Sequence, residues 1–152
     1  MKELLLLSML FAVESESRRL IDYYPQPTYS KSKPKAWATH TSIDLHNCLY
    51  SIMRSKHEVK RFLRKLCNHL GVTPYGDPEF LYHYSGNGYT AGLSAVQQAN
   101  GHTDITIRVN ESGDNMHIDV FSCKSYDPYD IADKAQRFFD AYDMTINVSY
   151  RK

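Results

Sequence analysis

The amino-acid sequence predicts an α+β fold, a two-layer sandwich in which an antiparallel sheet carries two helices on one face. The first observation is that two segments with helical spacing of apolar residues, near 55–71 and 127–142, lie among segments that alternate like strands. The second is that short turns join the four strand-like segments between the two helices. Strands joined in this way pair antiparallel, and two amphipathic helices can then share one face of the sheet.

The chain divides into three parts. Residues 1–17 contain an apolar run that is too short to span a bilayer, which needs about 20 residues, but has the length of a signal-peptide core. We interpret them as an apolar leader. Residues 18–35, rich in Pro, Ser and Lys, are typical of a linker, and 36–152 form the predicted domain. Acidic residues flank the apolar run, so a cytoplasmic location is expected, with secretion as the alternative.

The first strand and the first helix have clear sequence signals. Polar and apolar residues alternate over 39–45 and predict the strand. Ser55 and Glu58 have the spacing of a capping box, which predicts the start of a helix, and Gly71 predicts its end. The predicted buried face of this helix comprises Val59, Phe62, Leu63, Leu66 and Leu70.

Four strands and a second helix follow. Turns at 86–88, 100–101 and 112–114 separate strands predicted at 80–85, 89–97, 103–109 and 116–123. Asp127 as cap and Pro128 in the first turn predict the start of the second helix. Its predicted buried face comprises Ile131, Ala135, Phe138, Phe139 and Tyr142, and a last strand is predicted at 144–150.

Net charge and cysteine spacing indicate which kinds of binding partner are not expected. The net charge of +1 gives no electrostatic reason to expect binding to nucleic acid or to an anionic membrane. The three cysteines, Cys48, Cys67 and Cys123, show no CxxC spacing, which argues against a disulfide framework and against a zinc site. We therefore expect no metal, and we expect Cys48 and Cys67 in the core.

Three stretches of the domain resemble a known family. They are Ser42-Ile43-Asp44-Leu45-His46-Asn47-Cys48, then Tyr84-Ser85-Gly86-Asn87-Gly88-Tyr89 with Gly92-Leu93-Ser94-Ala95-Val96, and Ile118-Asp119-Val120-Phe121-Ser122-Cys123. In this order, and followed by an Asp-Pro helix, they resemble the small prokaryotic and phage-type S-adenosylmethionine (SAM) decarboxylases, which are pyruvoyl-dependent. The resemblance implies the same sandwich fold, SAM as substrate, a role in spermidine biosynthesis, and a homo-oligomer with sites near the subunit interface.

The resemblance also implies site residues. Family members cleave their own backbone before a serine, which becomes a pyruvoyl group that accepts electrons during loss of CO₂. Ser94 matches a second serine that assists this cleavage, and Cys123 matches the cysteine that donates a proton to the product.

The self-cleavage site itself is altered. Thr103 stands where the family has the serine, with His102 before it and Asp104 after it, and Arg108 replaces a histidine that assists cleavage. A threonine would give a bulkier 2-oxobutanoyl group in place of pyruvoyl, and its β-branch restricts χ1. Arg108 stays charged and cannot act as a base. The sequence therefore predicts that the chain stays intact. The alternative reading of Thr103 and Asp104 is an ordinary strand start.

Other residues are candidates for binding the substrate. Tyr84 and Tyr89 could stack on an adenine ring, and Glu111 could meet a sulfonium charge. The alternatives are ordinary strand tyrosines and a solvated hairpin.

Three functions remain open on this basis. The first is a SAM-processing enzyme resembling SAM decarboxylase, with an altered pyruvoyl site. The second is a SAM-degrading lyase of the phage type, giving methylthioadenosine and homoserine lactone, to which Asp44-Leu45-x-x-Cys48 and the segment 90–93 show short similarities. The third is a non-catalytic SAM-binding subunit.

Overall fold

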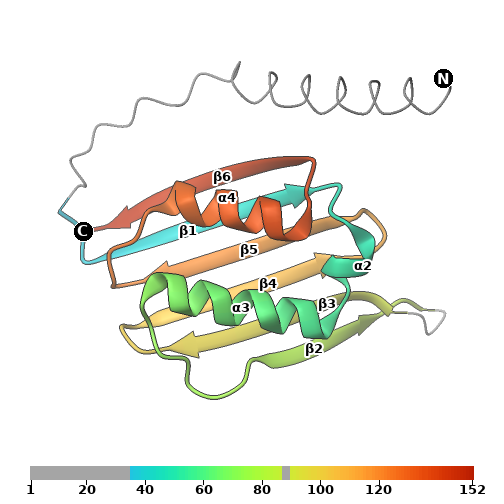
Figure 1. Ribbon diagram of the computed structural model, residues 1–152, viewed down its shortest axis with the longest axis horizontal. Coiled ribbons are helices and arrows are strands. Elements are labelled where there is room, and N and C mark those ends of the chain that lie inside the picture. The colour runs from blue at the N-terminus through green and yellow to red at the C-terminus, as the bar shows by residue number, and fades with distance from the viewer. Residues whose placement is uncertain (1–34, 87–89) are drawn as a thin grey trace, which may run out of the picture. The chain divides into compact units, whose positions relative to one another are not determined.

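The computed structural model describes residues 35–86 and 90–152. The predicted leader (1–17) and all but the last residue of the predicted linker (18–35) lie outside this part. Within it, a six-stranded antiparallel sheet has the strand order β2-β3-β4-β5-β1-β6. The two longer helices, α3 and α4, lie on the same face of this sheet (Figure 1). The structure confirms the predicted α+β sandwich.

The elements run along the chain as a βα unit, a four-stranded meander, and an αβ unit. Their bounds are β1 Ala38–His46, α2 Tyr50–Met53, α3 Lys56–Leu70, β2 Glu79–Tyr84, β3 Thr90–Ala99, β4 Thr103–Asn110, β5 Asn115–Ser122, α4 Pro128–Phe139 and β6 Asp143–Arg151. None of these helices is long and apolar enough to cross a membrane.

The hydrophobic core lies between the sheet and the two long helices. Ile43 of β1 and Ile118 of β5 pair across the strands, and both are completely buried. From the helix side, Phe62 of α3 packs against Phe139 of α4, with ring centroids 4.9 Å apart. Cys48 and Cys67 are buried, as expected.

The start of α3 has the predicted cap, with one difference in its hydrogen bonds. The Ser55 hydroxyl accepts a hydrogen bond from the Glu58 backbone N–H, and Gly71 ends α3 with a left-handed φ of 64°. The reciprocal half of the capping box is replaced, because the Ser55 N–H donates to the Ile52 carbonyl and the Glu58 carboxylate binds Arg61.

Two local features differ from the prediction. The short helix α2 was not predicted, and it places Met53 in the core. The helix α4 ends at Phe139, because Asp140 adopts a left-handed φ of 49°. The prediction that Tyr142 lies on the buried helix face is therefore wrong: Tyr142 is 87% exposed.

Replacing the cap of α3 tests the local origin of this helix. Ser55→Ala removes the acceptor for the Glu58 N–H, so we expect the free energy of unfolding to fall by about 1 kcal/mol. Urea denaturation followed by circular dichroism measures the change. Ser55→Asp, which keeps an acceptor oxygen at the cap, serves as the control and should retain most of the stability. Equal losses in both variants would contradict this role.

Candidate functional site

The sheet face that the helices leave uncovered carries polar side chains on its central strands. Side chains alternate between the two faces along each strand. Because Ile43 and Ile118 face the helices, their neighbours in sequence face the other way. The register then sets Ser42 opposite Asp119 and Asp44 opposite His117 across β1 and β5. We call the resulting group the polar cluster; it comprises His40, Ser42, Asp44, Arg108, His117 and Asp119.

Asp119 is the centre of the polar cluster. Its Oδ1 accepts from the Ser42 hydroxyl at 2.6 Å and lies 3.2 Å from Nε2 of His40. Its Oδ2 accepts from Nη1 of Arg108 at 3.0 Å and lies 3.0 Å from Nε2 of His117. Four donors from three strands therefore converge on one carboxylate.

These donors change the acidity of Asp119. Burial would raise the pKa of this carboxyl group, but hydrogen bonds from Ser42 and Arg108 and the nearby charge of His117 outweigh burial. They lower the pKa of Asp119 from 3.8 to about 2. The carboxylate is therefore charged at neutral pH.

His117 connects two carboxylates. Its Nδ1 lies 2.6 Å from Oδ1 of Asp44, while its Nε2 faces Asp119. Burial disfavours the charged imidazolium, but the hydrogen bond to Asp44 and the charge of Asp119 favour it more. Their balance raises the pKa of His117 above its usual 6.5.

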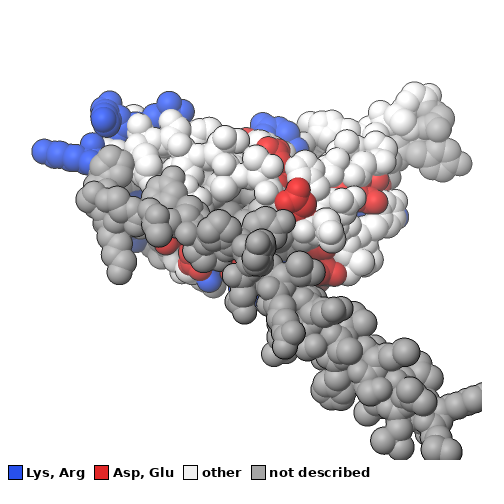
Figure 2. Space-filling model, turned by 90° about the horizontal axis from the view of Figure 1, so that it is seen from above, with Lys and Arg blue, Asp and Glu red and all other residues white. Residues whose placement is uncertain are grey.

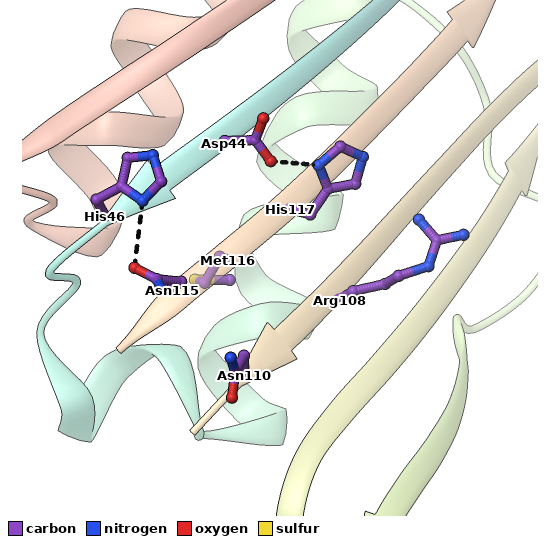
Figure 3. Close-up of a pocket in the computed structure, with 7 residues that line it drawn as sticks. All are labelled: Asp44, His46, Arg108, Asn110, Asn115, Met116 and His117. Atoms are coloured by element: carbon purple, nitrogen blue, oxygen red, sulfur yellow. Dashed lines mark hydrogen bonds and ion pairs between the residues drawn. The ribbon is translucent and has the colours of Figure 1, made fainter. Parts of the chain in front are cut away.

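A shallow pocket of about 160 Å³ opens beside the polar cluster. Figure 3 shows Asp44 and His117 facing each other on neighbouring strands, with Arg108 on the next strand. Near the strand ends, Nδ1 of His46 lies 3.3 Å from Oδ1 of Asn115. The lining residues are Asp44, His46, Arg108, Asn110, Asn115, Met116 and His117.

The pocket offers charges of both signs. The Arg108 side chain is 57% exposed, and that of Asp44 is 41% exposed, so both can still contact a ligand. A guanidinium group suits a carboxylate, and an Asp suits a cation. In residues 35–86 and 90–152, no group of three or more His, Cys, Asp or Glu is arranged to hold a metal ion.

Ser94 lies on the same uncovered face. It is opposite Arg108 in the pairing of β3 with β4. Its hydroxyl lies 2.8 Å from Nε2 of His83 on β2. A side chain at Gly92, two residues earlier, is excluded, because a Cβ there would lie 2.2 Å from the Val109 carbonyl oxygen. This glycine lets β3 approach β4 closely near the pocket.

The residues that the sequence predicts as an altered cleavage site lie elsewhere. Thr103, at the start of β4, is 1% exposed, and its Oγ1 lies 2.7 Å from the Ser122 hydroxyl on the helix side of the sheet. Asp104 points to the opposite face, where it accepts a hydrogen bond from Gln98. His102 is exposed in the preceding turn, with a left-handed φ of 47°.

Cys123 is next to this turn. It follows Ser122 at the end of β5, and its backbone N–H donates to the Gly101 carbonyl at 3.1 Å. Thr103 and Cys123 therefore lie at one end of the sheet, and Arg108 lies five residues farther along β4, a distance of about 17 Å. The structure does not bring Ser94 together with Thr103, because the two side chains are on opposite faces.

Two of the three predicted substrate-binding residues, Glu111 and Tyr84, lie toward the pocket end of the sheet. Glu111 follows Asn110, which lines the pocket, and its N–H donates to the Ala91 carbonyl. Tyr84 is 67% exposed at the end of β2. Tyr89 lies outside the described residues.

Sequence reasoning missed most of the polar cluster. His40, Ser42, Asp44, His117 and Asp119 were not candidate site residues, and Arg108 was noted only as the replacement of a family histidine. The signal was present, because His-x-Ser-x-Asp on the first strand and His-x-Asp on the fifth place polar residues at strand spacing. That pattern predicts one polar face on each of the two strands. It does not show that the two strands are neighbours in the sheet, with their polar faces side by side.

Comparisons with known proteins give consistent results. A family model described as S-adenosylmethionine decarboxylase matches residues 39–152. Among solved structures, the chain is similar to the crystal structure of the adenosylmethionine decarboxylase from Aquifex aeolicus VF5, with a TM-score of 0.59 and 17% sequence identity. That match covers 77% of this chain and 92% of the other, and supports the fold. No curated protein matches.

The low pKa of Asp119 predicts a specific dependence of stability on pH. A carboxyl group with a lowered pKa in the folded state stabilises the fold above its unfolded pKa, and this contribution is lost as the pH falls through the folded value. The stability difference between wild type and Asp119→Asn should therefore shrink as the pH falls from 3.8 to about 2.

Urea denaturation at a series of pH values measures this difference. Asp104→Asn is the matched control, because Asp104 is exposed on the same face and accepts from Gln98. A difference for Asp119→Asn that stays constant across this range would show that the donors around Asp119 do not stabilise its charge.

Proposed function

The chain belongs to the S-adenosylmethionine decarboxylase family, and from this premise we propose that it binds SAM at the polar cluster and cleaves it there without a pyruvoyl group. The observation that carries the proposal is the pocket beside the polar cluster, which presents Arg108 and Asp44 to one small volume. Family membership supports SAM as the ligand.

The charges of the pocket are complementary to the amino-acid end of SAM. That end carries a carboxylate, an ammonium group and a sulfonium centre, so a site for it needs both a cation and anions. Arg108 would bind the carboxylate through its exposed guanidinium group. Among the described residues, Asp44 contacts His117 through its Oδ1. Its Oδ2 would then bind the ammonium group. The charged carboxylate of Asp119 adds negative charge to the polar cluster beside the pocket.

The pocket is smaller than a typical site for a whole ligand of this size. Small-molecule pockets usually enclose about 300–1,000 Å³, against about 160 Å³ here. The amino-acid end would therefore occupy the pocket, and the adenosine would lie outside it over the uncovered face.

A lyase reaction fits such a site. An oxygen of the substrate carboxylate attacks the side-chain carbon that is bonded to sulfur, the C–S bond breaks, and its electron pair neutralises the sulfonium. The products are methylthioadenosine and homoserine lactone. No proton acceptor or electron sink is needed, so the protein has to hold the carboxylate close to the carbon that it attacks.

The surroundings of Thr103 argue against a pyruvoyl group in this chain. The family is pyruvoyl-dependent, but here the residue in the serine position has a β-methyl group, is buried on the helix side, and has its hydroxyl engaged by Ser122. The polar cluster lies on the other face. We therefore propose a reaction that does not pass through residue 103.

Decarboxylation is the second candidate function. It is favoured by the position of Cys123, which lies beside the turn before Thr103, where the family's proton donor is expected. This function would require cleavage before Thr103, so product analysis and the chain mass together separate the two candidates.

Product analysis tests the proposed reaction. We expect purified protein incubated with SAM to release methylthioadenosine, measured by liquid chromatography. Arg108→Ala should reduce kcat/KM by about 10- to 100-fold, because a charge-assisted hydrogen bond contributes about 1.5–3 kcal/mol. Arg137→Ala, on the exposed side of α4, is the control and should be near wild type.

Two outcomes would contradict the proposal. Release of CO₂ from carboxyl-labelled SAM with formation of decarboxylated SAM would identify a decarboxylase. Tight SAM binding in calorimetry without any product would identify a non-catalytic SAM-binding protein.

Mass spectrometry tests self-cleavage directly. We expect one species near 17.6 kDa under denaturing conditions, because Thr103 is β-branched and its hydroxyl is held by Ser122. Thr103→Ala, which lacks the attacking oxygen, should give the same pattern. Two wild-type fragments divided between His102 and Thr103, with a blocked terminus on the second, would show that the site is active.

A further inference from the structure

Two aromatic rings lie together at the end of the uncovered face that is remote from the pocket. The ring of Trp37, which precedes β1, lies 5.8 Å from the ring of Phe121 on β5, with the two planes at 64°. Phe121 follows Asp119 by two positions, so its side chain points to the same face of the sheet. We call Trp37 and Phe121 the aromatic pair. It borders the polar cluster on the face that the helices leave open.

Much of the aromatic pair is open to solvent. Trp37 is 59% exposed, and Phe121 is half-buried. A single exposed aromatic residue is ordinary on a protein surface. Two adjoining rings beside a cluster of charged residues instead provide a surface on which a flat ring can stack, because offset and edge-to-face contacts between rings are favourable.

The distance from the pocket to the aromatic pair suits a molecule of the length of SAM. Along β5, four residues separate Phe121 from His117, which lines the pocket, and this spacing corresponds to about 13 Å. In an extended SAM molecule, the carboxylate and the adenine lie at opposite ends and are separated by a comparable distance. With the amino-acid end at Arg108 and Asp44, the ribose would cross the rest of the polar cluster, and the adenine would reach Phe121.

The charges at the two ends of this face favour that direction of the ligand. The Trp37 N–H donates to the Arg151 carbonyl, and Arg151 and Lys152 are exposed at the end of the chain. Figure 2 views the protein from the side of β6 and shows Lys and Arg side chains gathered toward the end where Figure 1 places the C-terminus. The cationic sulfonium would be repelled from this end and attracted to Asp44 and Asp119, whereas adenine is neutral.

A carboxylate lies beside the aromatic pair. Asp104 of β4 is opposite Phe121 in the pairing of β4 with β5. Its Oδ1 accepts a hydrogen bond from Nε2 of Gln98 at 3.2 Å. Its Oδ2 would then accept a hydrogen bond from the amino group of adenine. Hypoxanthine has a carbonyl oxygen at that position, which cannot donate and would be repelled by a carboxylate.

We propose that the aromatic pair is the adenine subsite of this protein, with the adenine stacked on Trp37 and Phe121 and its amino group bound by Asp104. The inference rests on the proposed binding of SAM at the polar cluster, and it adds the residues that recognise the base. It differs from the sequence-based candidate Tyr84, which lies on the edge strand β2, three strands away from Phe121.

Fluorescence tests the contact with adenine. Trp37 is the only tryptophan of the chain, so the tryptophan emission of the full-length protein reports on this residue alone. Methylthioadenosine contains the adenosine part of SAM without the amino-acid end, and it should quench the emission in a saturable manner. Methylthioinosine, which carries hypoxanthine, should bind about 10-fold or more weakly, because it lacks the hydrogen bond to a charged group. Asp104→Asn should remove most of this preference.

Substitution of Trp37 tests the contribution of stacking. Trp37→Ala should raise the Kd of methylthioadenosine, measured by calorimetry, and the KM for SAM by about 5- to 100-fold, the range found for base–aromatic stacking. The kcat should stay unchanged, because the stack is the same in the ground state and the transition state. Trp37→Phe should retain most of the affinity. Tyr82→Ala is the matched control, because Tyr82 is an exposed aromatic residue opposite Leu93 on the helix side, and this variant should bind like wild type.

Two results would overturn the adenine subsite. One is a Trp37 emission that neither SAM nor methylthioadenosine changes up to millimolar concentration. The other is wild-type binding in both Trp37→Ala and Phe121→Leu, with circular dichroism showing that the variants are folded; a loss of binding confined to Tyr84→Ala would then place the adenine at β2.

Failure of the proposed reaction gives a different result. If methylthioadenosine quenches Trp37 but SAM yields no methylthioadenosine, the adenine subsite is supported and only the lyase reaction is refuted.

Discussion

The pairing of β1 with β5 is the constraint on which the rest of the structure depends. The first strand enters between the end of the meander and the last strand, so residues about 75 positions apart in the chain become neighbours. On the helix side, this pairing buries Ile43 against Ile118 in the centre of the core. On the other side, the same register brings Ser42 to Asp119. The core and the polar cluster therefore depend on the same register of β1 with β5, and a slip by one residue would disrupt both.

The polar cluster shows how a partly buried carboxylate is kept charged. Asp119 loses water contacts on the sheet but gains four donors, and these lower its pKa to about 2. His117 is stabilised in its charged form by carboxylates on both sides, Asp44 and Asp119. Such a network holds its members in place and leaves Arg108 and Asp44 exposed enough to contact a ligand. Prepositioned charges of both signs are what a zwitterionic, cationic substrate requires.

The two ends of β4 carry two different groups of predicted functional residues. At its start, Thr103, which the resemblance matches with the family's cleaved serine, contributes its hydroxyl to a buried contact with Ser122. Toward its end, Arg108 and Asn110 line the pocket on the opposite face. Retention of the family fold is therefore compatible with a change of the reacting group, since the sheet depends on the buried face of β4 and ligand binding would depend on the other.

The sequence by itself determined the elements whose signals are local. The Ser55 cap, the Gly71 stop and the Asp127-Pro128 start predicted both long helices, because capping bonds join residues two to four positions apart. Prediction failed where the local signals were weak. The short helix α2 was not predicted, and Tyr142 was wrongly assigned to the buried face of α4, which ends before the left-handed residue Asp140. Resemblance identified Ser94 and Cys123 as candidates, but only the tertiary structure placed Ser94 near Arg108 and away from Thr103. Only the tertiary structure also brought the members of the polar cluster together. Alternation predicts which side chains share a face of one strand, whereas strand order and register determine which strands, and therefore which side chains, lie next to each other.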